Sequence, residues 1–108
     1  MSTRTGIVQE SFKTSAAEVF RKYGTEDMTL YSAHNGLDLR GRDAVADAME
    51  KALGGKPTMR PSGEPVEQGN FVVTFAHATL PSGEERDLCG VYRFTEDDMI
   101  SGVWTMRA

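Results

Sequence analysis

His77 is the side chain in this sequence whose type and surroundings best suit chemistry. It lies within residues 70–80, which read Asn-Phe-Val-Val-Thr-Phe-Ala-His-Ala-Thr-Leu. An imidazole titrates near neutral pH, so His77 could act as a general acid or base, or it could orient a ligand. A core histidine bonded to a neighbouring hydroxyl explains the same pattern equally well. Tyr31 supplies a second polar group, and these two residues are the candidates for a catalytic role.

Strand alternation predicts the neighbours of His77. Phe71, Val73, Phe75 and Thr79 fall on its side of the strand, and this more apolar side is expected to face the interior. A slip of one residue would move His77 to the outer face. Trp104 and Met106 share a face of the last predicted strand and are expected to line the same cavity, although core packing is the favoured role of Trp104.

Gly90, Tyr92 and Phe94 share one face of the strand between these two, and they complete the predicted binding surface. Cys89 lies on the opposite face and is expected to be inert, with the solvated Asp87 beside it. Two histidines and one cysteine at these spacings match no set of metal ligands. The sequence therefore indicates no metal and no cofactor.

Two helical segments are expected to come first. Ser15 and Glu18 form a capping-box pattern, and the apolar face that follows ends at Gly24. Residues 7–12 could form a separate short helix or extend this one backwards, and two separate pieces are slightly favoured. A third helix is predicted to start after Gly41 and to end at Gly54-Gly55.

The predicted strands concentrate in the second half of the chain. A strand over 28–33 and a short return over 37–40 precede the third helix. Pro57, Pro61 and Pro65 then limit the next stretch to an edge or broken strand. Strands over 70–80, 86–95 and 99–107, joined by tight turns, predict an antiparallel meander. Helices followed by a meander indicate an α+β protein with the helices gathered on one face of the sheet.

Composition narrows the classes of partner. The chain has 108 residues, which fits a single domain spanning 1–108, and a net charge of -4 without a basic stripe. Nucleic acid and membranes are therefore not expected partners, and a single cysteine suits the cytoplasm. A homodimer is also predicted through one sheet face, assigned to small or apolar residues: Val72, Thr74, Ala76, Ala78 and Val91.

Two stretches resemble a known superfamily. Residues 31–49 contain Leu-Arg-Gly-Arg-Asp-Ala-Val at a strand-to-helix junction, and residues 90–104 contain Gly-Val-Tyr-Arg-Phe, an acidic turn and Met-Ile-Ser-Gly-Val-Trp. Their order and spacing resemble the SnoaL-like branch of the nuclear transport factor 2-like superfamily. The resemblance implies a strongly curved antiparallel sheet wrapped around N-terminal helices, a cone-shaped α+β barrel with a pocket at its wide end.

The resemblance also bears on chemistry. Ketosteroid isomerase relatives use an aspartate base and an oxyanion-stabilising tyrosine and aspartic acid. On that pattern the base position falls on Ser32 and the second acid falls on Gly90, so steroid isomerisation is not expected. The remaining readings are a pocket for a small apolar or aromatic molecule, with an isomerase, cyclase or hydrolase activity on a hydrophobic substrate, and a non-catalytic association domain with a filled pocket.

Overall fold

The computed structural model describes residues 3–33, 36–53, 59–80 and 82–108. Three helices lie in the first half of the chain: α1 (Thr3–Lys13), α2 (Ala16–Tyr23) and α3 (Arg42–Leu53). The strands are β1 (Gly24–Ser32), β2 (Leu37–Arg40), β3 (Met59–Pro61), β4 (Val66–Gln68), β5 (Phe71–Thr79), β6 (Glu85–Phe94) and β7 (Ile100–Arg107). The predicted elements are all present, and most boundaries agree within a few residues, but α1 and β1 each begin four residues earlier than expected.

The first two helices are separate, as the capping pattern indicated. Ser15 is extended, and its hydroxyl accepts a hydrogen bond of 3.2 Å from the backbone N–H of Glu18. This contact satisfies one of the first amide groups of α2, which have no partner inside the helix. At the other end the N–H of Gly24 bonds the carbonyl of Phe20, and the chain passes directly into β1.

The sheet has the strand order β2-β1-β7-β6-β5-β3, and β4 also pairs with β5. Strands β5, β6 and β7 form the predicted antiparallel meander. β1 runs parallel to β7, so the sheet is mixed and not purely antiparallel. The short strands β3 and β4 occupy the edge beyond β5, which fits the prolines of this region. The sheet is open, since β2 and β3 end the path without pairing to each other.

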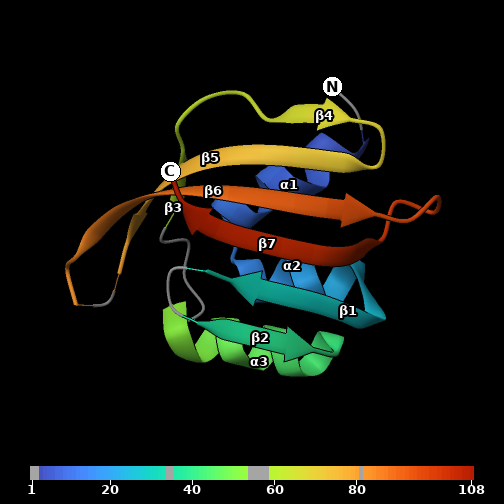
Figure 1. Ribbon diagram of the computed structural model, residues 1–108, viewed down its shortest axis with the longest axis horizontal. Helices are drawn as coiled ribbons and strands as arrows, with labels where there is room; N and C mark the ends of the chain where they lie inside the picture. Colours follow the sequence, from blue (N-terminus) through green and yellow to red (C-terminus); the bar gives the residue numbers. More distant parts are fainter. Residues whose placement is uncertain (1–2, 34–35, 54–58, 81) are drawn as a thin grey trace.

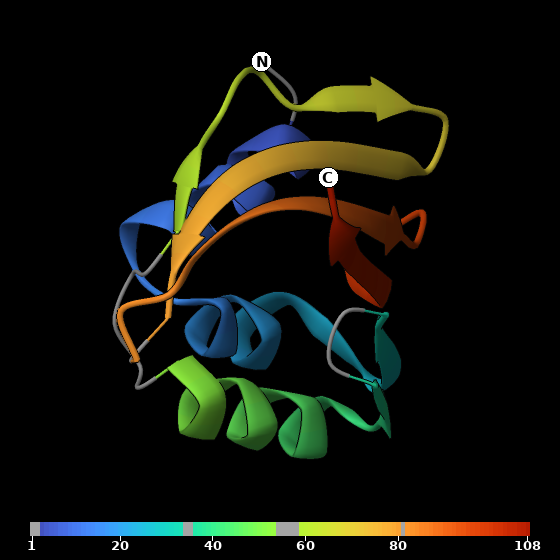
Figure 2. The same cartoon turned by 60° about the vertical axis from the view of Figure 1, so that its left-hand side comes forward.

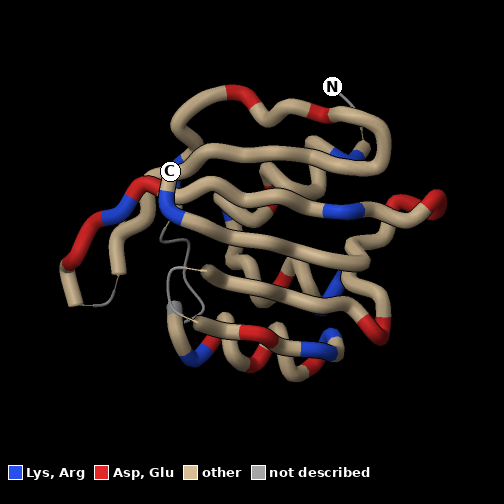
Figure 3. The backbone as a smooth tube through the Cα atoms, viewed as in Figure 1, with Lys and Arg blue, Asp and Glu red and all other residues tan. Residues whose placement is uncertain are grey.

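The three helices lie on one side of the sheet (Figure 1), and the sheet bends around them (Figure 2). The buried core sits between these layers and includes Val8, Phe20, Leu30, Val45 and Ile100. This arrangement confirms the α+β class and the strongly curved sheet. Figure 3, drawn from the outer side of the sheet, shows no charged residue along the middle of β5, β6 and β7.

The inner and outer faces of β5 are the reverse of the prediction. Thr74, Ala76 and Ala78 are buried, whereas Phe71 and Phe75 are 40% and 43% exposed. The curved inner face has helices packed against it, so small side chains fit there and bulky ones fit the outer face. The assumption that the larger apolar side chains of β5 face the interior was therefore wrong.

Some predicted features lie outside the described residues. These are the turn residues at 34 and 35, the end of the third helix at 54–55, Pro57 and the turn residue at 81. Within the described ranges, no helix is long and apolar enough to cross a membrane.

Candidate ligand-binding cavity

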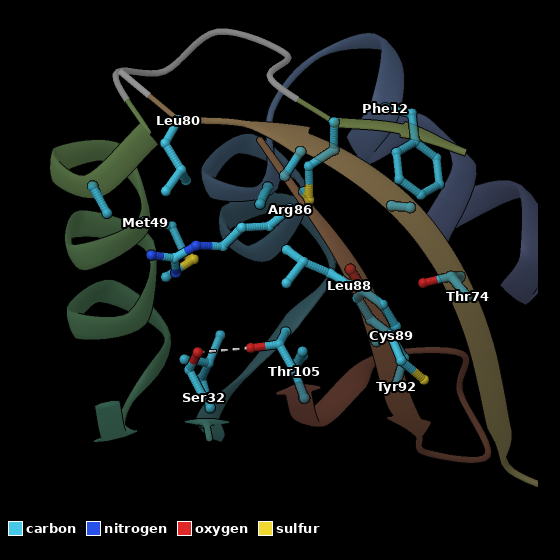
Figure 4. Close-up of a pocket in the computed structure, with 18 of the residues that line it drawn as sticks. Phe12, Ser32, Met49, Thr74, Leu80, Arg86, Leu88, Cys89, Tyr92 and Thr105 are labelled. Carbon is cyan, nitrogen blue, oxygen red and sulfur yellow. Dashed lines mark hydrogen bonds between the residues drawn. The ribbon is translucent and has the colours of Figure 1, made fainter. Parts of the chain in front are cut away.

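A cavity of about 490 Å³ lies between the inner face of the sheet and the helices (Figure 4). Its wall is mainly apolar and comes from all three helices and most strands. The apolar lining residues are Phe12, Ala16, Phe20, Leu30, Met49, Ala52, Met59, Ala76, Ala78, Leu80, Leu88 and Val103. A volume of several hundred Å³ with an apolar wall and a few polar groups is typical of a small-molecule site.

The hydroxyl groups of Ser32, Thr74 and Thr105 line the cavity from β1, β5 and β7. Thr105 Oγ1 donates to Ser32 Oγ across 2.8 Å, which joins β7 to β1. The proton of the Ser32 hydroxyl then has no acceptor among the described residues, and Ser32 is only 2% exposed. Thr74 on β5 is also buried, and its hydroxyl has no hydrogen-bond partner in the described ranges. Buried hydroxyls of this kind favour a ligand oxygen, because an unpaired polar group is costly in an apolar environment.

The residues of β6 that line the cavity are Arg86, Leu88, Cys89, Gly90 and Tyr92. Burial raises the pKa of the Tyr92 phenol, and a hydrogen bond with Ser11 offsets only part of this effect. The phenol therefore stays neutral at physiological pH. A Cβ atom at Gly90 would lie 3.1 Å from Thr74 Oγ1 and 3.4 Å from Tyr92 Cε1, so any larger side chain would have to project into the cavity.

One cation completes the lining among the described residues. Arg86 on β6 forms two hydrogen bonds, of 3.0 and 3.1 Å, with the Glu84 carboxylate. Arg86 thereby lowers the pKa of Glu84. Figure 4 shows the guanidinium reaching toward Met49 on α3. No aspartate, glutamate or histidine lines the described wall, so none of its side chains is a general base that titrates near neutral pH.

The predicted site residues divide into three groups. Ser32, Gly90 and Tyr92 line the cavity, as expected. Phe94 is buried in the adjacent core and does not line it. The others lie on the outer face of the sheet: Tyr31, Phe75, His77, Trp104 and Met106. For these five the predicted face was wrong, since they alternate with the buried residues of β1, β5 and β7.

His77 lies on the outer face between two carboxylates. Its Nδ1 is 3.0 Å from Asp87 Oδ1, and its Nε2 is 3.0 Å from Glu85 Oε1. The pKa of His77 is raised mainly by its hydrogen bond with Asp87 and then by its hydrogen bond with Glu85. The positive charge of Arg60 on the neighbouring β3 lowers this pKa. The hydrogen-bond partners of His77 are thus the carboxylates of Asp87 and Glu85, and not a neighbouring hydroxyl as one interpretation of the sequence had it.

Replacing His77 with glutamine is expected to change stability in a pH-dependent way. The pKa of His77 is raised by folding, so its charged contacts stabilise the native state below its unfolded pKa of about 6.5. This contribution is lost as the pH rises through the folded pKa. Urea unfolding should therefore show a larger difference between wild type and His77→Gln at about pH 5.5 than at about pH 9. An equal difference at both pH values would contradict the assignment.

Thr74, Thr105 and the lining residues of the helices were not predicted from the sequence as part of a site. Thr74 had a usable signal, because it shares one face of β5 with the small residues Ala76 and Ala78. Phe12, Phe20 and Met49 were expected only as apolar faces of helices. Their convergence on one cavity depends on the packing of α1, α2 and α3, which no local pattern specifies.

Several solved structures have a similar fold. A SnoaL-like family protein from Agrobacterium tumefaciens, proposed to be an isomerase, is 17% identical with a TM-score of 0.76, covering 99% of both chains. A proposed ketosteroid isomerase from Kribbella flavida is 15% identical with a TM-score of 0.78, covering 97% of this chain and 77% of its own. A nuclear transport factor 2-like protein of unknown function from Cytophaga hutchinsonii is 18% identical with a TM-score of 0.71, covering 95% and 94%.

No family model matches the sequence, and no curated protein matches it. The structural likeness, at these low identities, establishes the fold. The chain therefore has the α+β fold shared by SnoaL-like, ketosteroid isomerase-like and nuclear transport factor 2-like proteins.

Proposed function

We propose that this protein binds a small apolar or aromatic molecule in the cavity between the sheet and the helices. The observation that carries the proposal is the cavity itself, about 490 Å³ with a mainly apolar wall. Thr74 and the Ser32–Thr105 pair lie two strands apart with Gly90 between them, so each could bond a different oxygen atom of such a ligand. A ketone or phenol with an aromatic body fits both features.

The polar groups of the described wall support binding more than proton transfer. Ser32 and Gly90 occupy the positions where the isomerase pattern requires acids, and neither can take a proton from carbon. Loss of one oxyanion donor alone costs about a hundredfold or more in rate. We therefore expect no isomerase activity on a 3-oxo-Δ5-steroid. An isomerase, cyclase or hydrolase reaction that used only the described wall would need a ligand whose own groups supply the acid and base.

Calorimetric titration with a panel of aromatic ketones and phenols tests the binding proposal. A ligand of about 13 heavy atoms gains about 0.3 kcal/mol per atom, about 4 kcal/mol in all, so dissociation constants of about 1 mM are expected for first members of the panel. Trp104 fluorescence is a poor reporter, because this side chain lies outside the cavity. Absence of binding across the panel would overturn the binding proposal, and measured turnover of the steroid would overturn the separate expectation of no isomerase activity.

Replacing Thr74 with valine is expected to separate oxygen recognition from apolar contact. The substitution keeps the shape and removes a buried hydroxyl that has no partner in the described ranges. Binding of an aromatic ketone should weaken by about fivefold to tenfold, since one net hydrogen bond contributes about 1 kcal/mol. Binding of the hydrocarbon of the same shape should be unchanged or stronger. Equal losses for both ligands would show that the hydroxyl does not bond the oxygen.

The alternative role, an association domain with a filled pocket, is less well supported because the cavity is large. We also propose that the chain forms a homodimer through the outer face of the sheet, where Phe71 and Phe75 are exposed, and this is compatible with ligand binding in the cavity. We also propose that the protein works in the reducing cytoplasm, since its single cysteine, Cys89, allows no internal disulfide.

A further inference from the structure

Arg86 is the only charged side chain among the described residues that line the cavity. It belongs to the inner face of β6, where it lies opposite Ala78 of β5, and its side chain is 19% exposed. Its guanidinium reaches toward Met49 on α3, which lines the same cavity (Figure 4). The methylene groups of an arginine can cover an apolar wall, but its charged head needs polar or anionic partners. The cavity therefore has one positive charge beside a mainly apolar wall.

Glu84 pairs with this guanidinium from outside the cavity. Its two carboxylate oxygens accept hydrogen bonds of 3.0 and 3.1 Å from Nε and Nη2 of Arg86. The Glu84 side chain is 49% exposed and does not line the described wall. An ion pair with an exposed partner contributes little to stability, because water competes for its charges. Glu84 can therefore leave Arg86 at a small cost when another carboxylate replaces it.

We propose that Arg86 binds the carboxylate of the ligand, so that the cavity takes an aryl-alkanoic acid. This assignment rests on the proposed function of the cavity and specifies the class of its ligand. The ligand carboxylate replaces that of Glu84 on the Nε–Nη2 edge of the guanidinium, and the Glu84 side chain turns into solvent. One bidentate pair thereby replaces another on the same cation.

The order of the groups along β6 suits such a molecule. Arg86 and Gly90 are about 13 Å apart along the strand, at about 3.3 Å per residue. The hydroxyl-bearing Thr74 and Thr105 lie on either side of Gly90, in β5 and β7. Leu88 lines the wall between the cation and these hydroxyls. An acid with its carboxylate on Arg86 can thus lay an aromatic body along Leu88.

A neutral ligand gains less from Arg86. An amide or ketone has no charge with which to compete for the guanidinium, and a hydrogen bond between two charged groups is about twice as strong as one between neutral groups. No aspartate or glutamate lines the described wall, so none of its side chains repels an anion. The assignment therefore predicts that an acid binds more tightly than a neutral molecule of the same shape.

Calorimetric titration with phenylbutanoate and with its primary amide, phenylbutanamide, measures this preference. We expect the wild type to bind the acid about tenfold more tightly than the amide. Arg86→Met keeps an apolar side chain and removes the charge, so the acid should lose about tenfold in affinity and the amide no more than about twofold. Arg40→Met removes the same charge from an exposed position that does not line the cavity, and it should bind both ligands like the wild type.

Glu84→Gln gives a second readout that keeps Arg86 in place. It removes the competing carboxylate, so the acid should bind about threefold more tightly while amide binding stays the same. Circular dichroism verifies that each variant is folded. If the amide binds the wild type as tightly as the acid, if the preference for the acid survives Arg86→Met, or if Glu84→Gln leaves acid binding unchanged, the assignment is overturned and the cavity proposal stands. If neither these ligands nor the neutral panel binds the wild type, both are overturned.

Discussion

Replacing Gly24 with alanine is expected to lower the free energy of unfolding by about 3 kcal/mol. Gly24 joins α2 to β1, and its φ of -74° is ordinary for any residue. The obstacle is space: a Cβ atom would lie 2.5 Å from Met28 Sδ and 2.5 Å from the backbone oxygen of Phe20. The backbone oxygen belongs to the helix end that Gly24 caps, so it cannot move without weakening the cap.

Gly6→Ala is the matched control for this substitution. Gly6 lies inside α1, and a Cβ atom there would meet nothing within 4 Å. Alanine favours helix over glycine by up to about 1 kcal/mol, so this variant should be more stable than the wild type. Urea unfolding of both variants measures the two opposite changes. A Gly24→Ala protein as stable as the wild type would show that the junction is looser than described.

Replacing Ala76 with leucine is expected to abolish detectable ligand binding. Ala76 is 5% exposed and its methyl group lines the cavity, so a leucine there would take up part of the ligand's volume. The protein itself should lose little stability, because the added carbons enter open space and not a packed region. For a ligand whose dissociation constant is about 1 mM, a tenfold loss moves binding beyond the calorimetric range.

Ala44→Leu provides the control for the same change in volume. Ala44 is exposed on α3 and does not line the cavity. Binding by this variant should equal that of the wild type. If Ala76→Leu bound the same ligand with unchanged affinity, the ligand would occupy another part of the molecule.

The sequence predicted elements well where the signals are local. Ser15 and Glu18 located the start of α2, and the turn residues located the hairpins of the β5–β6–β7 meander. The parallel pairing of β1 with β7 was not predicted, because it joins segments about 70 residues apart and leaves no local pattern. The superfamily resemblance supplied the curvature of the sheet, which composition alone does not indicate.

The faces of the strands were predicted correctly only where charges mark them. In β6 the acidic Glu85 and Asp87 identify the outer face, so Gly90 and Tyr92 were placed inside correctly. β5 contains no charged residue except His77 when it is protonated, and both of its faces are apolar enough to be buried. The larger apolar side chains therefore suggested the wrong face as the interior. In the curved sheet the inner face of β5 is occupied by the small residues Thr74, Ala76 and Ala78. An outer face with this much apolar area is itself a sign of a partner.

Methyl NMR during titration with the aromatic ketones and phenols tests the cavity proposal most directly. With alanine methyl groups labelled, the signals of Ala76 and Ala78 should shift in a saturable way, because both line the cavity. The signals of Ala44 and Ala108, which do not line it, should stay in place. Shifts confined to alanines outside the cavity, or no shift of Ala76 and Ala78 up to the solubility limit of every ligand, would contradict the proposal that this cavity binds a small apolar molecule.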